Sequence, residues 1–479
     1  MHISFSKQLT AVICIAVAIL IYFINPLGVN PQGAKVIGVA SLLIGLWVTE
    51  ALPMPVTALL PLILFPLLNI SPIKTTAASY ANEVIFLFMG GFMLGLAIEK
   101  WNLHRRIALN IVRLTGTSGN RIILGFIIST GLISMWLSNT ATTMMMFPIA
   151  LSVVKVIEEN HSHKTGVSNF ATSIMIAIAL ASNFGGIATL IGTPPNVAYA
   201  SFISNNMKYT ISFADWMLVC MPLAVLLLFI FYMVMVKWLY PNGMKSDETT
   251  RTVIYTEIAA LGKMSLPEKR VFVIFAGTAF LWITKDLWNS ITLLKLDDNM
   301  IAIIGATALF ITPNGKNKQA LLEWKDTSKM AWGILLLFGG GIALASALEK
   351  AGLIQSLGLW FSQFSFDPLL LIFLVTLVSL FVSEVMSNIA QVIVFAPVVT
   401  ELARVAGLHP LQLGIPMTLA ASCASMLPMG TPPNAIAFSS GYIKLKDMTK
   451  VGFVMNMISI VLITLFCWLL LPLVFNLSR

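Results

Sequence analysis

Charged side chains are scarce in this sequence. Of its 479 residues, 10% are Asp, Glu, Lys or Arg, whereas 58% are hydrophobic. Soluble globular domains carry about 25% charged residues, so a chain of this composition cannot cover itself with a water-soluble surface. Intrinsic disorder is excluded as well, because disordered chains combine low hydrophobicity with high charge. The sequence therefore predicts a protein that resides in a lipid bilayer.

Cysteine and catalytic motifs are also lacking. The four cysteines, Cys14, Cys220, Cys423 and Cys467, lie in apolar stretches without CxxC spacing, which excludes a disulfide scaffold and a metal knuckle. No nucleophile–base pair or Glu-x-x-His box occurs, so we expect no enzyme and no cofactor other than a coupling ion. The net charge of +9 comes mainly from Lys and Arg in short connecting segments. Because such residues are enriched in cytoplasmic loops, this charge reflects the orientation of the chain in the membrane and does not indicate a nucleic-acid partner.

Long uncharged runs are what the sequence has in abundance. A membrane-spanning helix needs about 20 mostly apolar residues, and several of these runs are too long for one helix. They cover residues 8–34, 51–73, 122–154, 165–207, 405–443 and 451–478. We predict an all-α polytopic membrane protein with about 11 transmembrane helices and two re-entrant hairpins. Shorter apolar pieces lie near 83–100 and 333–350.

The chain divides into four parts at its polar segments. We predict an N-terminal transmembrane helix in 1–34, a first repeat in 35–240, a linker in 241–267 and a second repeat in 268–479. The linker region holds the best cluster of Lys and Arg, which the positive-inside rule places in the cytoplasm. We therefore expect a multi-pass protein of the plasma membrane.

An internal repeat supports the division into two halves. Three blocks recur in the same order, the first with 7 of 13 positions identical and the third without change. They are Phe88–Lys100 with Phe338–Lys350, Ser138–Ala141 with Ser387–Ala390, and Gly192–Asn196 with Gly430–Asn434. Duplicated halves with interrupted apolar segments at matching positions are typical of secondary transporters and indicate the binding site. An enzyme can also be duplicated, so the repeat favours a transporter without proving it.

The third block, Gly-Thr-Pro-Pro-Asn, predicts broken helices. Tandem prolines remove two backbone donors, and the residue before a proline avoids helical geometry. Helices should therefore break at Thr193 and Thr431, and such breaks are tolerated at membrane depth only where they are buried or line a cavity. New helix N-termini there suit a carboxylate, and freed carbonyls suit Na⁺. The alternatives are simple proline kinks and, at the Ser-Asn blocks, hydroxyls bonded back to the preceding turn.

The Ser-Asn and Gly-Thr-Pro-Pro-Asn blocks contain no Lys or Arg. Because burying uncompensated charge is costly, a bound anion must meet helix ends, hydroxyls, amides, a co-bound cation or a lysine from elsewhere. Glutamates beside apolar segments could relay protons or simply form caps and interhelical hydrogen bonds. They are Glu83, Glu99, Glu349 and Glu384. An intramembrane enzyme acting on a lipid and a channel are the alternatives from other classes.

Together with Trp47–Pro53 and Leu427-Pro428, these blocks resemble the divalent anion/sodium symporter family, which includes the INDY-type dicarboxylate transporters. The resemblance covers essentially the whole chain. It implies two inverted repeats that form a scaffold domain and a moving transport domain, a homodimer in the membrane lipid, and an elevator-like displacement. The implied substrates are C4–C5 dicarboxylates (succinate, malate, fumarate, 2-oxoglutarate), with citrate or sulfate as the alternative.

The resemblance also assigns residues to sites. Substrate carboxylates would meet Asn139, Thr140, Thr193, Ser387, Asn388 and Thr431. A first Na⁺ site would use Ser134, Ser138, Asn139 and the backbone near Gly192. A second would use Ser383, Asn388 and the backbones near Met386 and Gly430. One position departs from the sodium-coupled pattern, because Ile389 stands where that pattern has Thr. The family also contains sodium-independent dicarboxylate exchangers, so both Na⁺ symport and exchange stay open.

Overall fold

The computed structural model describes residues 6–25, 28–160, 164–244, 248–293, 295–315, 319–353, 356, 367–475 and 477. Apart from an isolated bridge between Pro313 and Ala320, the regular structure in these ranges is helical. The first half contains α1 (Lys7–Ile24), α2 (Pro31–Thr49), α3 (Met54–Leu67), α4 (Ile73–Ala78), η1 (Ser79–Ala81), α5 (Glu83–Lys100), α6 (Leu103–Thr115), α7 (Gly119–Ser134), α8 (Asn139–Asn160), α9 (Lys164–Gly186), α10 (Pro194–Met207), α11 (Phe213–Met233) and η2 (Val234–Leu239). The second contains α12 (Glu248–Ala260), α13 (Leu266–Ile291), α14 (Asp298–Ile311), η3 (Trp324–Lys329), α15 (Trp332–Lys350), α17 (Pro368–Ser383), α18 (Asn388–Val405), α19 (Pro410–Ser422), α20 (Pro432–Phe438) and α21 (Leu445–Val474).

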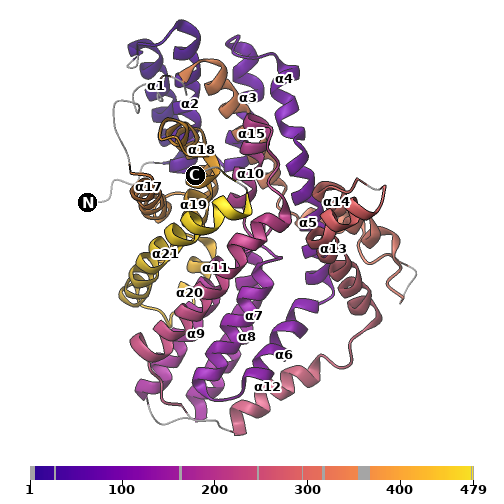
Figure 1. Cartoon of the computed structure of the whole chain (residues 1–479). Helices are drawn as coiled ribbons and strands as arrows, with labels where there is room; N and C mark the ends of the chain where they lie inside the picture. The colour runs from indigo at the N-terminus through magenta and orange to yellow at the C-terminus, as the bar shows by residue number, and fades with distance from the viewer. Residues whose placement is uncertain are drawn as a thin grey trace.

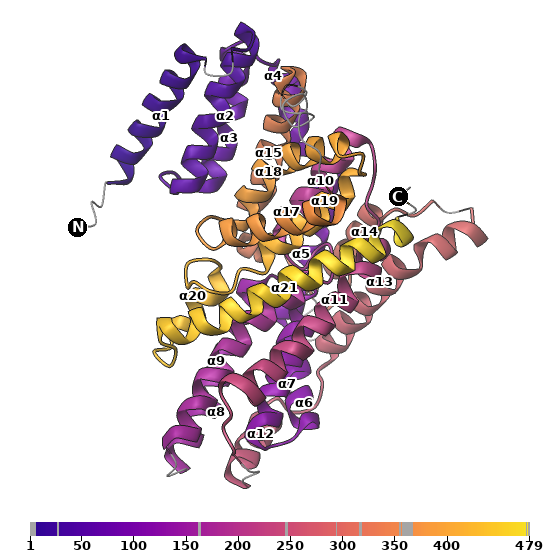
Figure 2. The same cartoon turned by 60° about the vertical axis from the view of Figure 1, so that its left-hand side comes forward.

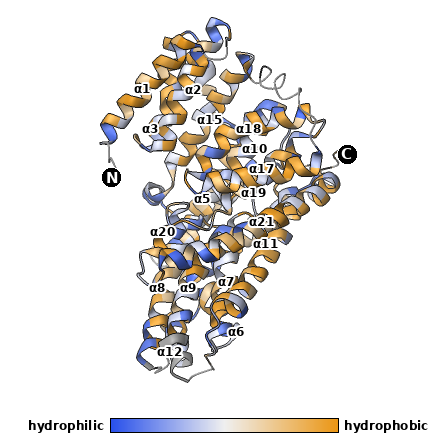
Figure 3. Cartoon of the chain, turned by 90° about the vertical axis from the view of Figure 1, so that its left-hand side faces the viewer, coloured by the Kyte–Doolittle hydropathy of each residue, from blue (hydrophilic) through white to orange (hydrophobic). Residues whose placement is uncertain are grey.

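Ten described helices are long and apolar enough to cross a membrane. They include Ile73–Lys100 and Trp332–Lys350, so the apolar pieces near 83–100 and 333–350 belong to stretches that are long and apolar enough to span. Four shorter apolar helices add to them, among them α7 and α17. Figure 3 shows hydrophobic residues along most of the length of the helices. The prediction of an all-α polytopic membrane protein is confirmed.

The helices are arranged in successive groups along the molecule. Figures 1 and 2 both show α1–α4 at one end and α6–α9 with α12 at the other. Between these groups lie α17, α18 and α19, while the long α21 crosses the molecule beside α11. The Ser-Asn block of the second half, at the start of α18, therefore lies in the middle of the fold, and that of the first half, at the start of α8, lies in the neighbouring group α6–α9.

Each half contains a helical hairpin packed on an interrupted helix. In the first half α7 and α8 pack on α9, and in the second half α17 and α18 pack on α19. The continuations of the interrupted helices are exchanged between the halves, because α10 packs on α18 and α19 while α20 packs on α8 and α9. This reciprocal exchange brings the repeated blocks of both halves together.

The first hairpin depends on close backbone approach. A Cβ atom on Gly185 of α9 would lie 2.2 Å from the carbonyl oxygen of Gly131 in α7 and 2.6 Å from its Cα. Overpacking of this kind costs about 1–3 kcal/mol, so we expect Gly185→Ala to lower the thermal unfolding temperature of the purified protein. Gly277→Ala in α13 is the matched control, because a Cβ there meets nothing within 4 Å. Equal unfolding temperatures for the two variants would contradict this packing.

The segment between the halves is partly helical and is tied to α6. Arg105 forms an ion pair with Glu257 of α12 at 2.5 Å, and Arg106 forms one with Glu268 of α13 at 2.9 Å. The Arg106 guanidinium also donates to the carbonyl of Gly262 at the end of α12. These contacts fix the predicted linker 241–267 against the first half, while its cytoplasmic placement stays a prediction.

Candidate functional site

Both hairpins have the same tip. Ser134 ends α7, and its hydroxyl lies 2.8 Å from Asn139 Oδ1 and 2.8 Å from a backbone carbonyl oxygen of α9, the two acceptors for its single hydrogen. Ser383 ends α17 and repeats this pair of contacts, with its hydroxyl 2.7 Å from Asn388 Oδ1 and 2.6 Å from a backbone carbonyl oxygen of α19. The Ser-Asn blocks therefore lie at the hairpin tips, where a new helix begins. The serines that precede these blocks, Ser134 and Ser383, bind each hairpin to its interrupted helix.

Both Gly-Thr-Pro-Pro-Asn blocks are helix breaks, as the prolines predict. Thr193 and Thr431 have extended backbones and are the N-caps of α10 and α20. The block's asparagine then binds a carbonyl of the preceding turn, at 2.8 Å for Asn196 Nδ2 and 3.1 Å for Asn434 Nδ2. These amides satisfy carbonyls that the interrupted helix leaves free.

The tips and breaks of both halves meet at one cavity of about 860 Å³. Every predicted substrate residue lines it: Asn139, Thr140, Thr193, Ser387, Asn388 and Thr431. Of the predicted cation ligands, Ser138, Met386 and Gly430 line it too. Ser134, Gly192 and Ser383 do not line the cavity and are buried. The cavity has the size of an organic-ligand site, and residues about 240–250 positions apart in the sequence meet in it.

Several hydrogen-bond donors face this cavity without a protein partner. Within the described ranges, the hydroxyls of Thr140, Thr193 and Ser387 form no hydrogen bond. Thr431 Oγ1 accepts from Asn183 Nδ2 at 3.1 Å and from a backbone N–H at 3.4 Å. Because those bonds use its lone pairs, the Thr431 hydroxyl hydrogen is available to a further acceptor. The lining is therefore rich in donors for carboxylate oxygens.

Among the described residues, this lining contains no fixed cationic side chain. Glu50 is the charged residue among those that surround the cavity, and none of them is Lys, Arg or His. The N-termini of α8, α10 and α18 lie at the cavity and contribute partial positive charge. Thr49 and Glu50 belong to the Trp47–Pro53 block. That this block lines the cavity was not predicted from the sequence.

The first predicted cation site has converging oxygens. A Cβ on Gly192 would lie 2.4 Å from the carbonyl oxygen of Gly186 and 3.0 Å from that of Ser134. A Cβ on Gly186 would lie 2.2 Å from Asn139 Oδ1. Neutral hydroxyl, amide and carbonyl oxygens at unwound helices are the ligands that transporters use for Na⁺. The donor set therefore fits a small monovalent cation.

The second predicted cation site adds a carboxylate. A Cβ on Gly430 would lie 3.1 Å from Glu384 Oε2 and 3.3 Å from the carbonyl oxygen of Leu427. Glu384 is buried and accepts backbone N–H bonds from Ser425, Met426 and Leu427 at 2.8–3.0 Å. Of the two roles considered for this glutamate, the structure shows hydrogen bonding between segments. The oxygen-rich surroundings fit a cation here as well.

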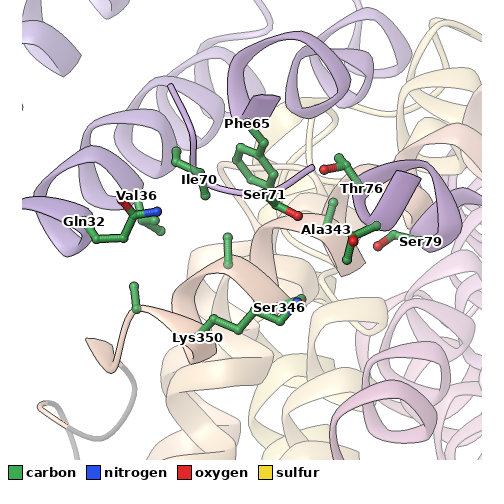
Figure 4. A pocket seen from close by; sticks show the side chains of 13 residues that line it. Gln32, Val36, Phe65, Ile70, Ser71, Thr76, Ser79, Ala343, Ser346 and Lys350 are labelled. Atoms are coloured by element: carbon green, nitrogen blue, oxygen red, sulfur yellow. The ribbon is translucent and has the colours of Figure 1, made fainter. Parts of the chain in front are cut away.

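A second, smaller pocket of about 220 Å³ lies elsewhere, between α2, α3, α4 and α15. Figure 4 shows Ser71, Thr76 and Ser79 on one side of it and Ser346 and Lys350 of α15 on the other. It shares no lining residue with the larger cavity and contains none of the predicted site residues. We therefore assign the substrate site to the larger cavity.

A cavity between paired broken helices of a multi-pass membrane protein defines a secondary transporter. The chain belongs to the family described as the sodium:sulfate symporter transmembrane region, which matches residues 5–475. It is 38% identical over 459 residues to the sodium-dependent dicarboxylate transporter SdcS of Staphylococcus saprophyticus, covering 94% of this chain and 88% of that protein. The Staphylococcus aureus protein of the same name is 38% identical over 466 residues, covering 95% and 89%.

Two solved structures share the fold. The YdaH transporter of Alcanivorax borkumensis has a TM-score of 0.54 at 12% identity, covering 84% of this chain and 88% of that one. MtrF of Neisseria gonorrhoeae, described among antimetabolite efflux pumps, has a TM-score of 0.50 at 13% identity, covering 83% of each chain. At these identities the likeness concerns the helical transporter architecture alone.

Proposed function

We propose that this protein is a secondary active transporter that carries C4–C5 dicarboxylates across the plasma membrane together with Na⁺. The observation that carries the proposal is the single cavity on which both hairpin tips and both helix breaks converge, rich in donors and without a basic side chain. The names of the Staphylococcus relatives, sodium-dependent dicarboxylate transporters, support the substrate class and the ion. The protein is a carrier and not an enzyme.

The two sides of the cavity suit the two ends of a dicarboxylate. One carboxylate would bind the Asn139-Thr140 tip with Thr193, and the other the Ser387-Asn388 tip with Thr431. Hydrogen bonds to charged groups contribute about 1.5–3 kcal/mol each, and three helix N-termini add favourable potential. Na⁺ held by the oxygens near Gly192 and Gly430 supplies the positive charge that the side chains do not.

Movement of the site across the membrane requires a fixed wall. Val48, Thr49 and Met54 from α2 and α3, with Ala331 and Ile334 beside and within α15, line the cavity as well. We assign these helices to the scaffold and the hairpins with their broken helices to the transport domain. The two halves act as inverted repeats, and displacement of the transport domain along the scaffold of a homodimer is an elevator mechanism.

Uptake into proteoliposomes tests the substrate class. Under an inward Na⁺ gradient, we expect labelled succinate to enter at a saturable rate and unlabelled malate, fumarate and 2-oxoglutarate to compete. Citrate and sulfate in excess, the alternative substrates, should compete weakly. Sulfate uptake without succinate uptake would overturn the proposed substrate, and flux that does not saturate would indicate a channel.

Ile389 provides a prediction about substrate affinity. Its side chain lines the cavity beside Asn388, at the position where the first half has Thr140. A hydroxyl there would add a hydrogen bond to a carboxylate, worth about 1.5–3 kcal/mol, so we expect Ile389→Thr to lower the KM for succinate by about tenfold or more. Ile389→Val, which changes size without adding a donor, is the control. An equal KM in the two variants would show that residue 389 does not contact substrate.

A further inference from the structure

A single amide connects the two sides of the cavity. Asn183 of α9 is fully buried, and its Nδ2 donates to Thr431 Oγ1 at 3.1 Å and to Asn434 Oδ1 at 3.3 Å. Its Oδ1 accepts from Asn139 Nδ2 at 3.5 Å. Because Asn139 belongs to the first hairpin tip and Thr431 to the second helix break, this side chain bridges the two repeats.

Backbone carbonyls favour one orientation for each of these amides. Asn434 Nδ2 donates to the carbonyls of Ala424 and Leu427 at 3.4 and 3.1 Å, so its Oδ1 faces Asn183. Asn183 must then present its Nδ2 to Asn434, since two oxygens would repel, and its Oδ1 faces Asn139. Asn139 in turn presents its Nδ2 to Asn183 and its Oδ1 to Ser134 and the first cation site. The second break therefore sets the direction of an oxygen in the first cation site.

The bridge runs in one direction only. The corresponding stretch of α19 and its end, Ala421-Ser422-Cys423, contains no amide side chain. Consistently, Asn196 Oδ1 in the first break is buried and has no hydrogen-bond partner among the described residues, whereas its counterpart Asn434 Oδ1 binds Asn183. The link between the first tip and the second break is therefore not repeated between the second tip and the first break.

We infer that Asn183 is a positioning residue that couples the first cation site to carboxylate binding at the second break. A cation on Asn139 Oδ1 stabilises the orientation in which Asn139 Nδ2 faces Asn183. The Asn183 amide then holds Thr431 Oγ1 as an acceptor, which directs the Thr431 hydroxyl hydrogen toward the substrate. This inference rests on the proposed function, because it requires both a cation and a dicarboxylate at the cavity.

The test is the coupling factor between the two ligands, measured by calorimetry on the full-length purified protein. This factor is the ratio of the succinate Kd in choline to the succinate Kd in saturating Na⁺. Coupling between sites is typically 5–150-fold, and we expect Asn183→Leu to reduce the wild-type factor about tenfold. By linkage, succinate must tighten Na⁺ binding by the same factor, which gives an independent measurement. Asn183→Ser leaves room for water and keeps one hydrogen bond, so its coupling factor should lie between those of the wild type and Asn183→Leu. The serine variant replaces the leucine variant in the test if the latter does not fold.

Ser173→Ala is the matched control on the same helix, because the Ser173 hydroxyl is buried and has no described partner. It should leave the coupling factor unchanged. If Asn183 had a merely structural role, its substitution would weaken succinate binding equally with and without Na⁺. An unchanged coupling factor in both Asn183 variants would overturn the role inferred for Asn183 and leave the proposed function intact. Wild-type protein that binds succinate equally well in Na⁺ and choline would overturn this inference together with the proposed sodium coupling.

Discussion

Replacing either tip asparagine by alanine is expected to reduce succinate uptake to background, a loss of about 100-fold or more. Asn139 and Asn388 each have an Oδ1 bound to the serine that ends the preceding helix and a side chain on the cavity. Each would contact both cation and substrate in the proposed complex. Loss of two polar interactions with charged groups, at about 1.5–3 kcal/mol each, accounts for an effect of this size. Uptake into proteoliposomes measures it.

Folding must be shown to survive these substitutions. Thermal unfolding and size-exclusion profiles of Asn139→Ala and Asn388→Ala should stay close to those of the wild type, because both side chains are only partly buried. Asn110→Ala is the control, since that amide binds a carbonyl of its own helix, α6, away from the cavity. Normal uptake by both tip variants would refute the site.

Glu384→Ala is expected to cause the second large effect, on stability as well as on transport. The carboxylate accepts from three consecutive backbone N–H groups before the second break and from Asn456 Nδ2 of α21 at 2.7 Å. An unsatisfied buried donor costs about 1–3 kcal/mol, so losing the common acceptor of four donors should destabilise the protein by about 3 kcal/mol or more. We expect a clearly lower unfolding temperature and loss of uptake.

Two further glutamate variants separate the causes. Glu384→Gln keeps a side-chain oxygen that can accept some of these bonds, so its unfolding temperature should lie between those of the wild type and Glu384→Ala. Glu83→Ala removes an exposed carboxylate bonded to Ser204 and should change little. A wild-type unfolding temperature for Glu384→Ala would show that the loop does not depend on this carboxylate.

Local backbone chemistry made part of the site predictable. Thr193 and Thr431 precede tandem prolines, and this alone identifies them as the ends of helix breaks. The recurrence of Ser138-Asn139 as Ser387-Asn388 indicated that both tips serve one purpose, and the cavity brings them together. These features depend on a few neighbouring residues, so the sequence carries them directly.

Features that depend on distant contacts were not predictable. Asn183 is an isolated asparagine in an apolar helix, and its role arises only from its contacts with Thr431 and Asn139. Glu50 follows a helix end, and nothing in its neighbours indicates that it lines the cavity. Similarly, the stretch Ile73–Lys100 is long and apolar enough to cross a membrane, although the extended backbone of Asn82 separates η1 from α5 within it.

The measurement that most directly tests the role of a cation in place of basic side chains is succinate uptake into empty proteoliposomes. With no dicarboxylate inside, we predict that an inward Na⁺ gradient drives accumulation of succinate above its external concentration. Replacing Na⁺ by choline on both sides should abolish this accumulation. Uptake that ignores Na⁺ and occurs only when the vesicles are preloaded with dicarboxylate would contradict symport and establish exchange.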